Sequence, residues 1–299
     1  MTVGVDGQVL AGGGRIVAYS NFVKVAHTVF SLPFAFVGVA AAARLHPVTL
    51  RTVLLVIAAF GTARFAAMGF NRIADRRLDA ANPRTAGREL PAGRMSLAEA
   101  WMVVVAMSAL FVLSAALLNP LCFALSPVAL AWVTVYSYSK RFTSLSHLWL
   151  GLGMAISPVG GYLAVTGVWS TPWWQLLLLV LVVACWGGGF DVLYSLQDEQ
   201  FDREHGLKSA TVALGAPRAI SASRLLHGAA ATAIVAYGIA AGFGAWYFSG
   251  AALAAGLLIW EHRLVKPYDY SRLDAAFFSM NGIISWVVMV GAVADVVLR

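Results

Sequence analysis

Apolar runs of about 20 residues recur along almost the whole of this 299-residue chain, and they constrain its fold more than any other feature. A helix of about 20 apolar residues is long enough to span the hydrocarbon core of a bilayer. Hydrophobic residues make up 60% of the chain and charged residues 12%, a balance that excludes an ordinary soluble domain. The runs are continuous, which favours helices over strands of alternating polarity.

The sequence therefore predicts an all-α, polytopic membrane protein with nine transmembrane helices. Residues 1–21 are expected to form a short N-terminal tail, and residues 22–299 a single transmembrane domain. The expected spans are 22–43, 49–70, 97–118, 120–138, 147–167, 174–195, 219–241, 244–262 and 276–297.

The distribution of positive charge predicts how these helices are oriented. Every second connection is short and almost uncharged, and the others are longer and basic. Of the 21 Lys and Arg residues, only Arg44, Arg51 and Arg299 fall on the side opposite the N-terminus, and Arg64 lies within a span. Because basic loops stay in the cytoplasm, the N-terminus is expected there, and the protein in a cell inner (plasma) membrane. The net charge of +7 follows from this topology, so no nucleic-acid partner is expected.

Two groups of polar residues lie where apolar spans end on this predicted cytoplasmic side. The first acidic stripe is Asn71, Asp75 and Asp79, and the second is Asp191, Tyr194, Asp198 and Asp202. Residues four apart share one face of a helix, so each stripe crowds its carboxylates together. Crowded carboxylates repel one another unless a cation lies between them, and oxygen ligands suit a divalent metal. The stripes predict a metal-bridged anionic substrate with an apolar tail.

A simpler interpretation is that these carboxylates pair with nearby arginines such as Arg76, Arg77 and Arg203 at helix ends. Asp191 argues for function, because an ionisable group at its depth costs a few kcal/mol unless it is partnered. The glycines at 187–189 would let another helix or a ligand approach closely. Tyr194, one turn further on, is either part of the site or an interfacial anchor.

Four cationic residues are candidates for binding an anionic diphosphate group: Arg64, Arg72, Lys140 and Lys208. Arg64 lies seven residues before Asn71, two turns deeper on the same face, and is either an anion ligand or a structural partner of a carboxylate. Lys140 and Arg72 are equally compatible with ordinary anchoring at a helix end. Lys208 lies in a loop containing Gly and Ser that resembles a phosphate-binding turn.

At the two acidic stripes the sequence resembles the UbiA superfamily of intramembrane aromatic prenyltransferases. The first stripe is similar to the family's N-x3-D-x3-D motif and the second to its other aspartate motif, and both are complete. The stretches 31–38, 82–93, 136–143 and 206–215 also resemble the family, so the likeness covers nearly the whole chain. It implies a helical bundle around a central cavity that opens toward the cytoplasm and laterally to lipid.

The resemblance also implies a reaction, a cofactor and two substrates. It assigns Mg²⁺ binding to Asn71, Asp75, Asp79, Asp198 and Asp202, and a place near the reacting carbon or the acceptor to Asp191 and Tyr194. The Mg²⁺ ions would bind a polyprenyl diphosphate, and cationic side chains would stabilise the departing pyrophosphate. The expected reaction transfers the polyprenyl group to the ring of an aromatic acid, 4-hydroxybenzoate or a hydroxynaphthoate, in ubiquinone or menaquinone biosynthesis.

Several alternatives stay open at this point. The segments at 27–36 and 82–93 resemble bacterial 4-hydroxybenzoate polyprenyltransferase-type sequences, including relatives in the futalosine route to menaquinone. Haem O, chlorophyll and archaeal lipid enzymes share the metal motifs. An organic-anion transporter would use Asp191 and Arg64 as gates and the glycines at 187–189 as a helix break. Donor length, general base and oligomeric state are undetermined.

Overall fold

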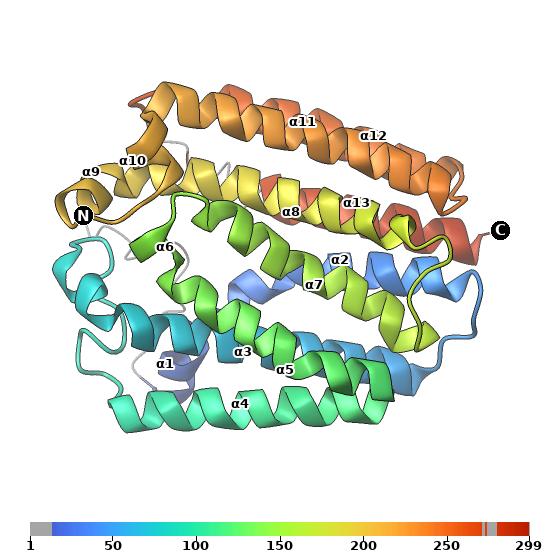
Figure 1. The fold of residues 1–299 in the computed structure, drawn as a ribbon, viewed down its shortest axis with the longest axis horizontal. Helices are drawn as coiled ribbons and strands as arrows, with labels where there is room; N and C mark the ends of the chain where they lie inside the picture. The colour runs from blue at the N-terminus through green and yellow to red at the C-terminus, as the bar shows by residue number, and fades with distance from the viewer. Residues whose placement is uncertain (1–13, 271–272, 274–279, 299) are drawn as a thin grey trace.

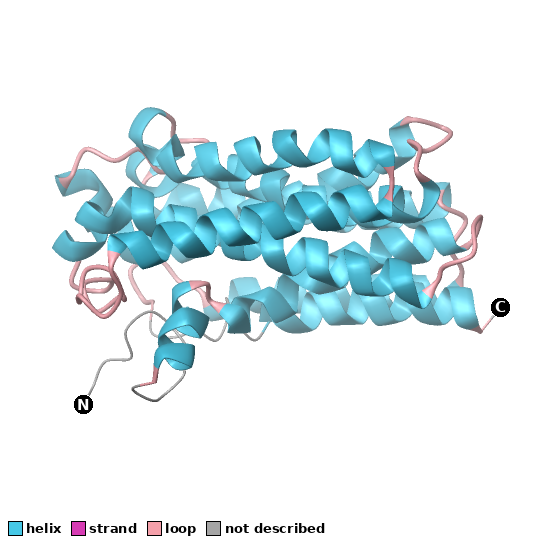
Figure 2. Cartoon of the chain, turned by 90° about the horizontal axis from the view of Figure 1, so that it is seen from below, coloured by secondary structure: helices cyan, strands magenta, loops and turns pink. Residues whose placement is uncertain are grey.

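The computed structural model describes residues 14–270, 273 and 280–298 of the chain. Within these ranges the secondary structure is helical, apart from an isolated bridge between Lys266 and Asp269. The long helices run side by side along one axis, with loops at both ends of the bundle (Figures 1 and 2). The predicted all-α class is confirmed.

Short and longer connections join the helices. In chain order they are α1 Arg15–Phe22, α2 Val25–Ala43, α3 Leu50–Ala81, α4 Leu97–Leu118, α5 Pro120–Val135, the 3₁₀ helix η1 Tyr136–Tyr138, α6 Ser139–Phe142, α7 Ser146–Thr166, α8 Trp174–Tyr194, the 3₁₀ helix η2 Ser195–Asp198, α9 Glu199–Glu204, α10 Ala210–Leu214, α11 Ala216–Ala240, α12 Ala245–Leu264 and α13 Asn281–Val297.

Each predicted span overlaps one of these long helices, and most of the described ends agree within three residues. Helix α3 continues past the predicted end at residue 70 to Ala81, so it carries the whole first acidic stripe. Helix α13 begins at Asn281, and the predicted start at 276 falls outside the described residues. Part of the predicted N-terminal tail forms α1, which a left-handed Lys24 (φ 51°) separates from α2.

Six described helical segments are long and apolar enough to cross a membrane by length and composition. They are Leu50–Ala81, Leu97–Leu118, Pro120–Phe142, Ser146–Thr166, Trp174–Glu204 and Ala216–Ala240. Shorter apolar stretches occupy Ser31–Ala43 and Asn281–Val297. The count of nine spans and the cytoplasmic N-terminus therefore stay predictions.

Polar side chains explain where several helices begin. Ser96 caps α4 in a capping box, because its hydroxyl accepts from the N–H of Glu99 while the Glu99 carboxylate accepts from the N–H of Ser96. Asn119 caps α5, and Pro120 follows at the first helical position, where its missing N–H costs nothing. Asn119 is the single residue between α4 and α5, so this cap marks a sharp turn between the two helices.

Helix α8 lies at the centre of the bundle, between α7 on one side and α11 on the other (Figure 1). Every residue from 182 to 190 is buried. A Cβ at Gly151 of α7 would overlap the Ala184 carbonyl of α8, and one at Gly189 would overlap the ring of His227 on α11. The expectation that small residues let helices approach here is confirmed.

The glycines at 187–189 lie within this continuous helix. The transporter interpretation placed a helix break at these glycines, and that expectation is therefore wrong. Continuity has a physical reason: packing against α7 and α11 on both sides stabilises a segment whose glycines would weaken an isolated helix.

The bundle has two unequal parts. Helices α11, α12 and α13 pack against α8 and α2 and form an apolar core with them. Helices α2 to α8 instead surround a cavity. The loop after α3, together with α6, α9 and α10, lies at one end of the bundle, and the C-terminus lies at the other (Figure 1). The site is built at the end that carries these short elements.

Candidate active site

A cavity of about 740 Å³ brings the two acidic stripes together. Every residue of both stripes lines it, although the stripes are more than 110 residues apart in the chain. Away from the stripes the wall is largely apolar, with Phe60, Leu125, Ala129, Trp132 and Leu150 among its residues. The cavity thus joins an acidic end to an apolar channel.

The first stripe lies on one continuous α-helix, as predicted. Asn71 Nδ2 donates to Asp75 Oδ2 at 3.0 Å, and Arg141 Nη2 donates to Asp75 Oδ1 at 3.2 Å. Arg88 Nη1 donates to Asp79 Oδ1 at 2.7 Å. The other oxygen of Asp79, Oδ2, is buried and has no hydrogen-bond partner among the described residues.

The second stripe does not lie on a single α-helix, and this part of the prediction is wrong. Helix α8 ends at Tyr194, a 3₁₀ turn covers Ser195–Asp198, and α9 follows. A 3₁₀ turn holds three residues instead of 3.6, so it rotates the residues after it relative to a regular helix. The carboxylates of Asp198 and Asp202 nevertheless line the cavity, and both residues are buried.

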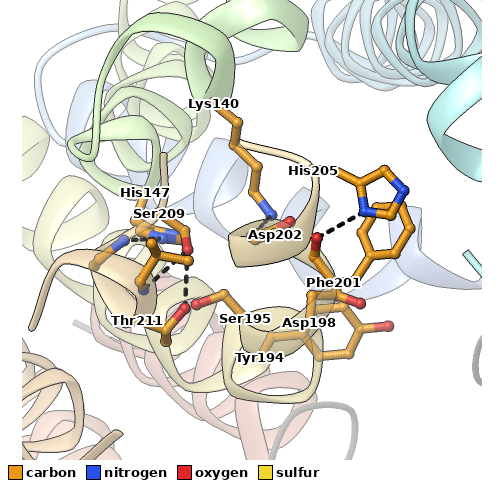
Figure 3. A network of polar contacts seen from close by, with 12 residues as sticks. Lys140, His147, Tyr194, Ser195, Asp198, Phe201, Asp202, His205, Ser209 and Thr211 are labelled. Carbon is orange, nitrogen blue, oxygen red and sulfur yellow. Dashed lines mark hydrogen bonds and ion pairs between the residues drawn. The ribbon is translucent and has the colours of Figure 1, made fainter. Parts of the chain in front are cut away.

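Each buried carboxylate of the second stripe pairs with a cation from elsewhere in the chain. Arg84 binds Asp198 through two hydrogen bonds, Nε to Oδ1 at 3.0 Å and Nη2 to Oδ2 at 2.6 Å. Lys140 Nζ donates to Asp202 Oδ2 at 3.1 Å (Figure 3). Arg84 also lies over the Tyr194 ring, 5.5 Å from its centroid, and Nη1 donates to the hydroxyl at 3.3 Å.

The local pairing considered from the sequence is not what holds these aspartates. Arg203 donates to Glu199 at 2.8 Å, and Arg76 donates to the Ile73 carbonyl at 3.2 Å. In each case the arginine and its partner are neighbours on the same helical segment. The cations at the stripes come instead from the loop after α3 and from α6, so they reflect tertiary structure.

His147 is a site residue that the sequence analysis missed. Its Nδ1 lies 2.6 Å from Asp191 Oδ2, and the residue is buried at the start of α7. A lone histidine near the end of an apolar run has no spacing signal. Arg84 and Arg88 were also missed as individual residues, although their spacing of four in a basic loop after the first stripe is a usable signal.

The four predicted diphosphate ligands are placed differently from one another. Arg72 is buried, and it lines the cavity together with Lys140 and Arg64. The Nε of Arg64 is buried without a hydrogen-bond partner in the described part of the chain. Lys208 is not among the described lining residues: it is exposed, and its Nζ donates to the Phe142 carbonyl at 3.3 Å. Lys208 attaches its loop to α6, and its assignment to the diphosphate stays a prediction.

The acidic end fits Mg²⁺ that is shared with a substrate. Within the described ranges, no three His, Cys, Asp or Glu side chains gather closely enough to hold a metal by themselves. Mg²⁺ is usually bound through one or two carboxylates, with water and substrate phosphates as further ligands. Each stripe offers such a pair, and the buried, unpartnered Oδ2 of Asp79 is a ready oxygen ligand.

Comparison with known proteins agrees with this geometry. Residues 31–283 match the UbiA prenyltransferase family. A 4-hydroxybenzoate octaprenyltransferase of Aromatoleum aromaticum is 32% identical over 82% of this chain and 80% of its own length. The apo structure of a UbiA homolog from Aeropyrum pernix K1 is 38% identical, with a TM-score of 0.82, over 90% of this chain and 98% of that chain.

A second solved structure supports the fold alone. It is a UbiA homolog from Archaeoglobus fulgidus bound to GPP and Mg²⁺, 18% identical, with a TM-score of 0.74 over 93% of this chain and 99% of that chain. The family match covers most of the chain, and it agrees with two complete aspartate motifs that meet at one cavity. The chain belongs to the UbiA prenyltransferase family.

Proposed function

We propose that this prenyltransferase transfers a polyprenyl group from polyprenyl diphosphate to the ring of a hydroxylated aromatic acid, with Mg²⁺ as cofactor. One observation carries the proposal: a single cavity holds both acidic stripes at one end and an apolar wall beyond them. A polyprenyl diphosphate has the same division, with a strongly anionic head and a long apolar chain. The names of the relatives support 4-hydroxybenzoate as acceptor and a quinone pathway.

The diphosphate would lie between the stripes. Asp75 and Asp79 on one side, and Asp198 and Asp202 on the other, would hold Mg²⁺. When bound, Mg²⁺ would neutralise the diphosphate and make it a better leaving group. The cations that pair with these carboxylates belong to flanking elements, so they lie close enough to contact phosphate oxygens as well. Lys140, which bonds Asp202 at 3.1 Å, is the first candidate for this contact.

Arg64 fits the acceptor better than the diphosphate. It precedes Asp75 by eleven residues on α3, a rise of roughly 16 Å along the helix. Arg64 therefore lies deeper in the cavity than the carboxylates that would hold the metal. A buried guanidinium with an unpartnered Nε suits the carboxylate of an aromatic acid, so we reassign Arg64 from the diphosphate to the acceptor.

The reaction exchanges one bond for another at C1 of the donor. The C1–O bond breaks, and its electron pair leaves with the diphosphate. A carbon of the electron-rich ring bonds to C1, and the ring then loses the proton on that carbon. Asp191, the first residue of the second stripe, would orient the acceptor by binding the acceptor's hydroxyl group. The apolar wall excludes water, which would otherwise compete with the ring for C1.

The proposed setting is a cell inner membrane, with the acidic end toward the cytoplasm. Basic loops at the end that carries α6, α9 and α10 support this orientation. An acceptor of the haem O, chlorophyll or archaeal lipid type would be the next possibility to test within the family.

A turnover assay in membranes tests the proposal. Geranyl or longer diphosphate with Mg²⁺ would be offered with 4-hydroxybenzoate and, in parallel, 1,4-dihydroxy-6-naphthoate. We expect a prenylated product from one acceptor, and its loss with EDTA or in Asp198→Ala. Product formation that persists in both controls would contradict the metal site.

Separate variants test the acceptor assignment. Arg64→Gln should raise KM for the aromatic acid while KM for the diphosphate stays near wild type. Arg64→Lys retains the charge and should recover part of the affinity. The reverse pattern, with KM raised for the diphosphate, would return Arg64 to the donor site.

A further inference from the structure

The hydrogen bonds of His147 determine which of its nitrogens carries the proton. His147 is 2% exposed and joins three elements: it lies on α7, contacts Asp191 of α8 and contacts Ala210 at the start of α10. Figure 3 shows it beside Ser209, the residue before Ala210. Its Nδ1 is 2.6 Å from Asp191 Oδ2, and its Nε2 is 3.2 Å from the backbone nitrogen of Ala210.

Only one neutral form of the ring satisfies both contacts. A backbone N–H can only donate, so Nε2 must present its lone pair to Ala210. The single proton of a neutral imidazole is then on Nδ1, where it is donated to the Asp191 carboxylate. The other tautomer would place a lone pair against a carboxylate and an N–H against an N–H.

We propose that His147 is a positioning residue that holds the Asp191 carboxylate in its working orientation through this Nδ1–H tautomer. The proposal rests on the proposed function, in which Asp191 orients the acceptor. The bond to His147 engages Oδ2 and leaves Oδ1 for the hydroxyl of the acceptor. The side chain of Asp191 is 16% exposed, and both residues line the cavity, so a substrate can reach it.

The surrounding structure supports a fixed ring. Gly188 allows α7 to approach, because a Cβ there would lie 3.3 Å from the His147 carbonyl oxygen. Ser209 is fully buried, and its hydroxyl caps α10 by accepting from the Val212 N–H at 3.3 Å. This cap fixes the first turn of α10, and therefore the direction of the Ala210 N–H.

The same loop links Asp191 to Asp202, the last residue of the second stripe. The Lys208 N–H donates to the Lys140 carbonyl at 2.6 Å, and the Lys140 side chain binds Asp202. Ala210 therefore lies two residues from an attachment to α6. The loop connects the carboxylate that would orient the acceptor to one that would hold the metal.

Three substitutions at His147 separate its two bonds. The amide nitrogen of Asn lies near the position of Nδ1, so His147→Asn can still donate to Asp191. In His147→Gln the amide lies near the position of Nε2, so that variant keeps the contact with Ala210 and loses the one with Asp191. We expect kcat to fall about 10- to 100-fold in the Gln and Ala variants and only a few-fold in the Asn variant. KM for the diphosphate should stay near wild type in all three.

A backbone change tests the contact at Nε2 without replacing His147. Ala210→Pro removes the N–H that faces Nε2, and proline is accepted at the first position of a helix. The preceding Ser209 is extended (φ −128°, ψ 164°), which is the conformation that a following proline requires. We expect kcat to fall several-fold, because the proline Cδ would occupy the space between the backbone nitrogen and Nε2, which are 3.2 Å apart, and would displace the ring from Asp191. Ala210→Gly, which retains the N–H, is the matched control and should stay closer to wild type.

The direct readout is ¹⁵N NMR of the full-length protein labelled at histidine, with His147→Asn to assign the signals. We expect His147 to be protonated at Nδ1 and unprotonated at Nε2 at neutral pH. A ring protonated at Nε2, or at both nitrogens, would overturn the proposal, and so would an Asn variant as impaired as the Ala variant. If the wild type transferred no prenyl group, the proposed function would fail, while the NMR result would still decide the tautomer.

Discussion

The two acidic stripes are similar in sequence but differ in how the fold presents them. The first lies on a regular α-helix, and Asp75 at its centre is only partly buried. The second crosses from α8 through a 3₁₀ turn into α9, and its Asp198 and Asp202 are both buried. The first stripe is thus a rigid edge of the cavity, whereas the second depends on the packing of several short elements around it.

The same two elements pair with both stripes. In the loop after α3, Arg84 binds the second stripe and Arg88 the first. In α6, Lys140 binds the second stripe, and its neighbour Arg141 binds the first. Each of these two elements therefore supplies one cation to each stripe. This arrangement places positive charge on both sides of the position proposed for the diphosphate.

The largest effect should come from removing one carboxylate from either stripe. Asp75→Asn and Asp198→Asn should each lower kcat by about 10³-fold or more, because each removes a proposed metal ligand and with it several kcal/mol of transition-state stabilisation. Turnover at saturating diphosphate measures this loss. The exposed Glu204→Gln is the control and should remain active. A large loss in one stripe only would show that a single stripe holds the metal.

The next effect should come from the two arginines of the loop after α3. Arg84→Gln and Arg88→Gln should reduce kcat by roughly 10- to 100-fold. The larger loss is expected for Arg84, because it binds both carboxylate oxygens of Asp198, whereas Oδ2 of Asp79 has no hydrogen-bond partner among the described residues. Values of kcat measured over a range of Mg²⁺ concentrations would report this loss. Arg94, in the same loop but paired with Glu89, offers a matched Arg94→Gln control. Equal losses would contradict the difference proposed between the stripes.

A smaller effect, on stability, tests how the second stripe is placed. Gly151→Ala would insert a methyl group between α7 and α8 and should destabilise the fold by about 1–3 kcal/mol. Thermal unfolding in detergent would report the loss. Gly228→Ala on the exposed side of α11 has no atom within 4 Å of the new Cβ and should be neutral or slightly stabilising. A stable Gly151→Ala protein would mean that α7 can shift without cost.

The smallest effect is expected from exchanges that keep the charge in α6. Lys140→Arg should lower kcat a few-fold, because its partner Asp202 has a side chain only 3% exposed, and a larger guanidinium must fit there. Arg141→Lys should change kcat less, since the Arg141 side chain is 42% exposed. The comparison uses kcat for both variants under one set of conditions. A larger loss of kcat in Arg141→Lys than in Lys140→Arg would contradict the expectation that the second stripe depends more on its cation than the first.

Much of the fold and part of the site follow from local features of the chain. Helix positions follow from apolar runs, since each run must bury its backbone polar groups in its own hydrogen bonds. The residues of the two stripes follow from their spacing of three or four, and the family follows from these motifs. The glycines at 187–189 correctly indicated a close approach of neighbouring helices.

Other features depended on contacts between distant segments, which sequence spacing does not encode. The 3₁₀ turn at Ser195–Asp198 interrupts a pattern that reads as a continuous helix. Lys208 resembled a phosphate ligand by its loop composition, yet its side chain faces the Phe142 carbonyl. Charge alone does not specify which anion Arg64 would bind, so its assignment to the diphosphate stays a prediction beside the proposed assignment to the acceptor.

By itself, the sequence determined the helical class, the acidic stripes and the chemical family, because these depend on periodicity and composition. Only the tertiary structure decided that Arg84, Arg88, Lys140 and Arg141 bridge the stripes, and that His147 holds Asp191. Those pairings join residues far apart in the chain, so they arise when the packing of α7, α8 and their short neighbours brings the side chains within hydrogen-bonding distance.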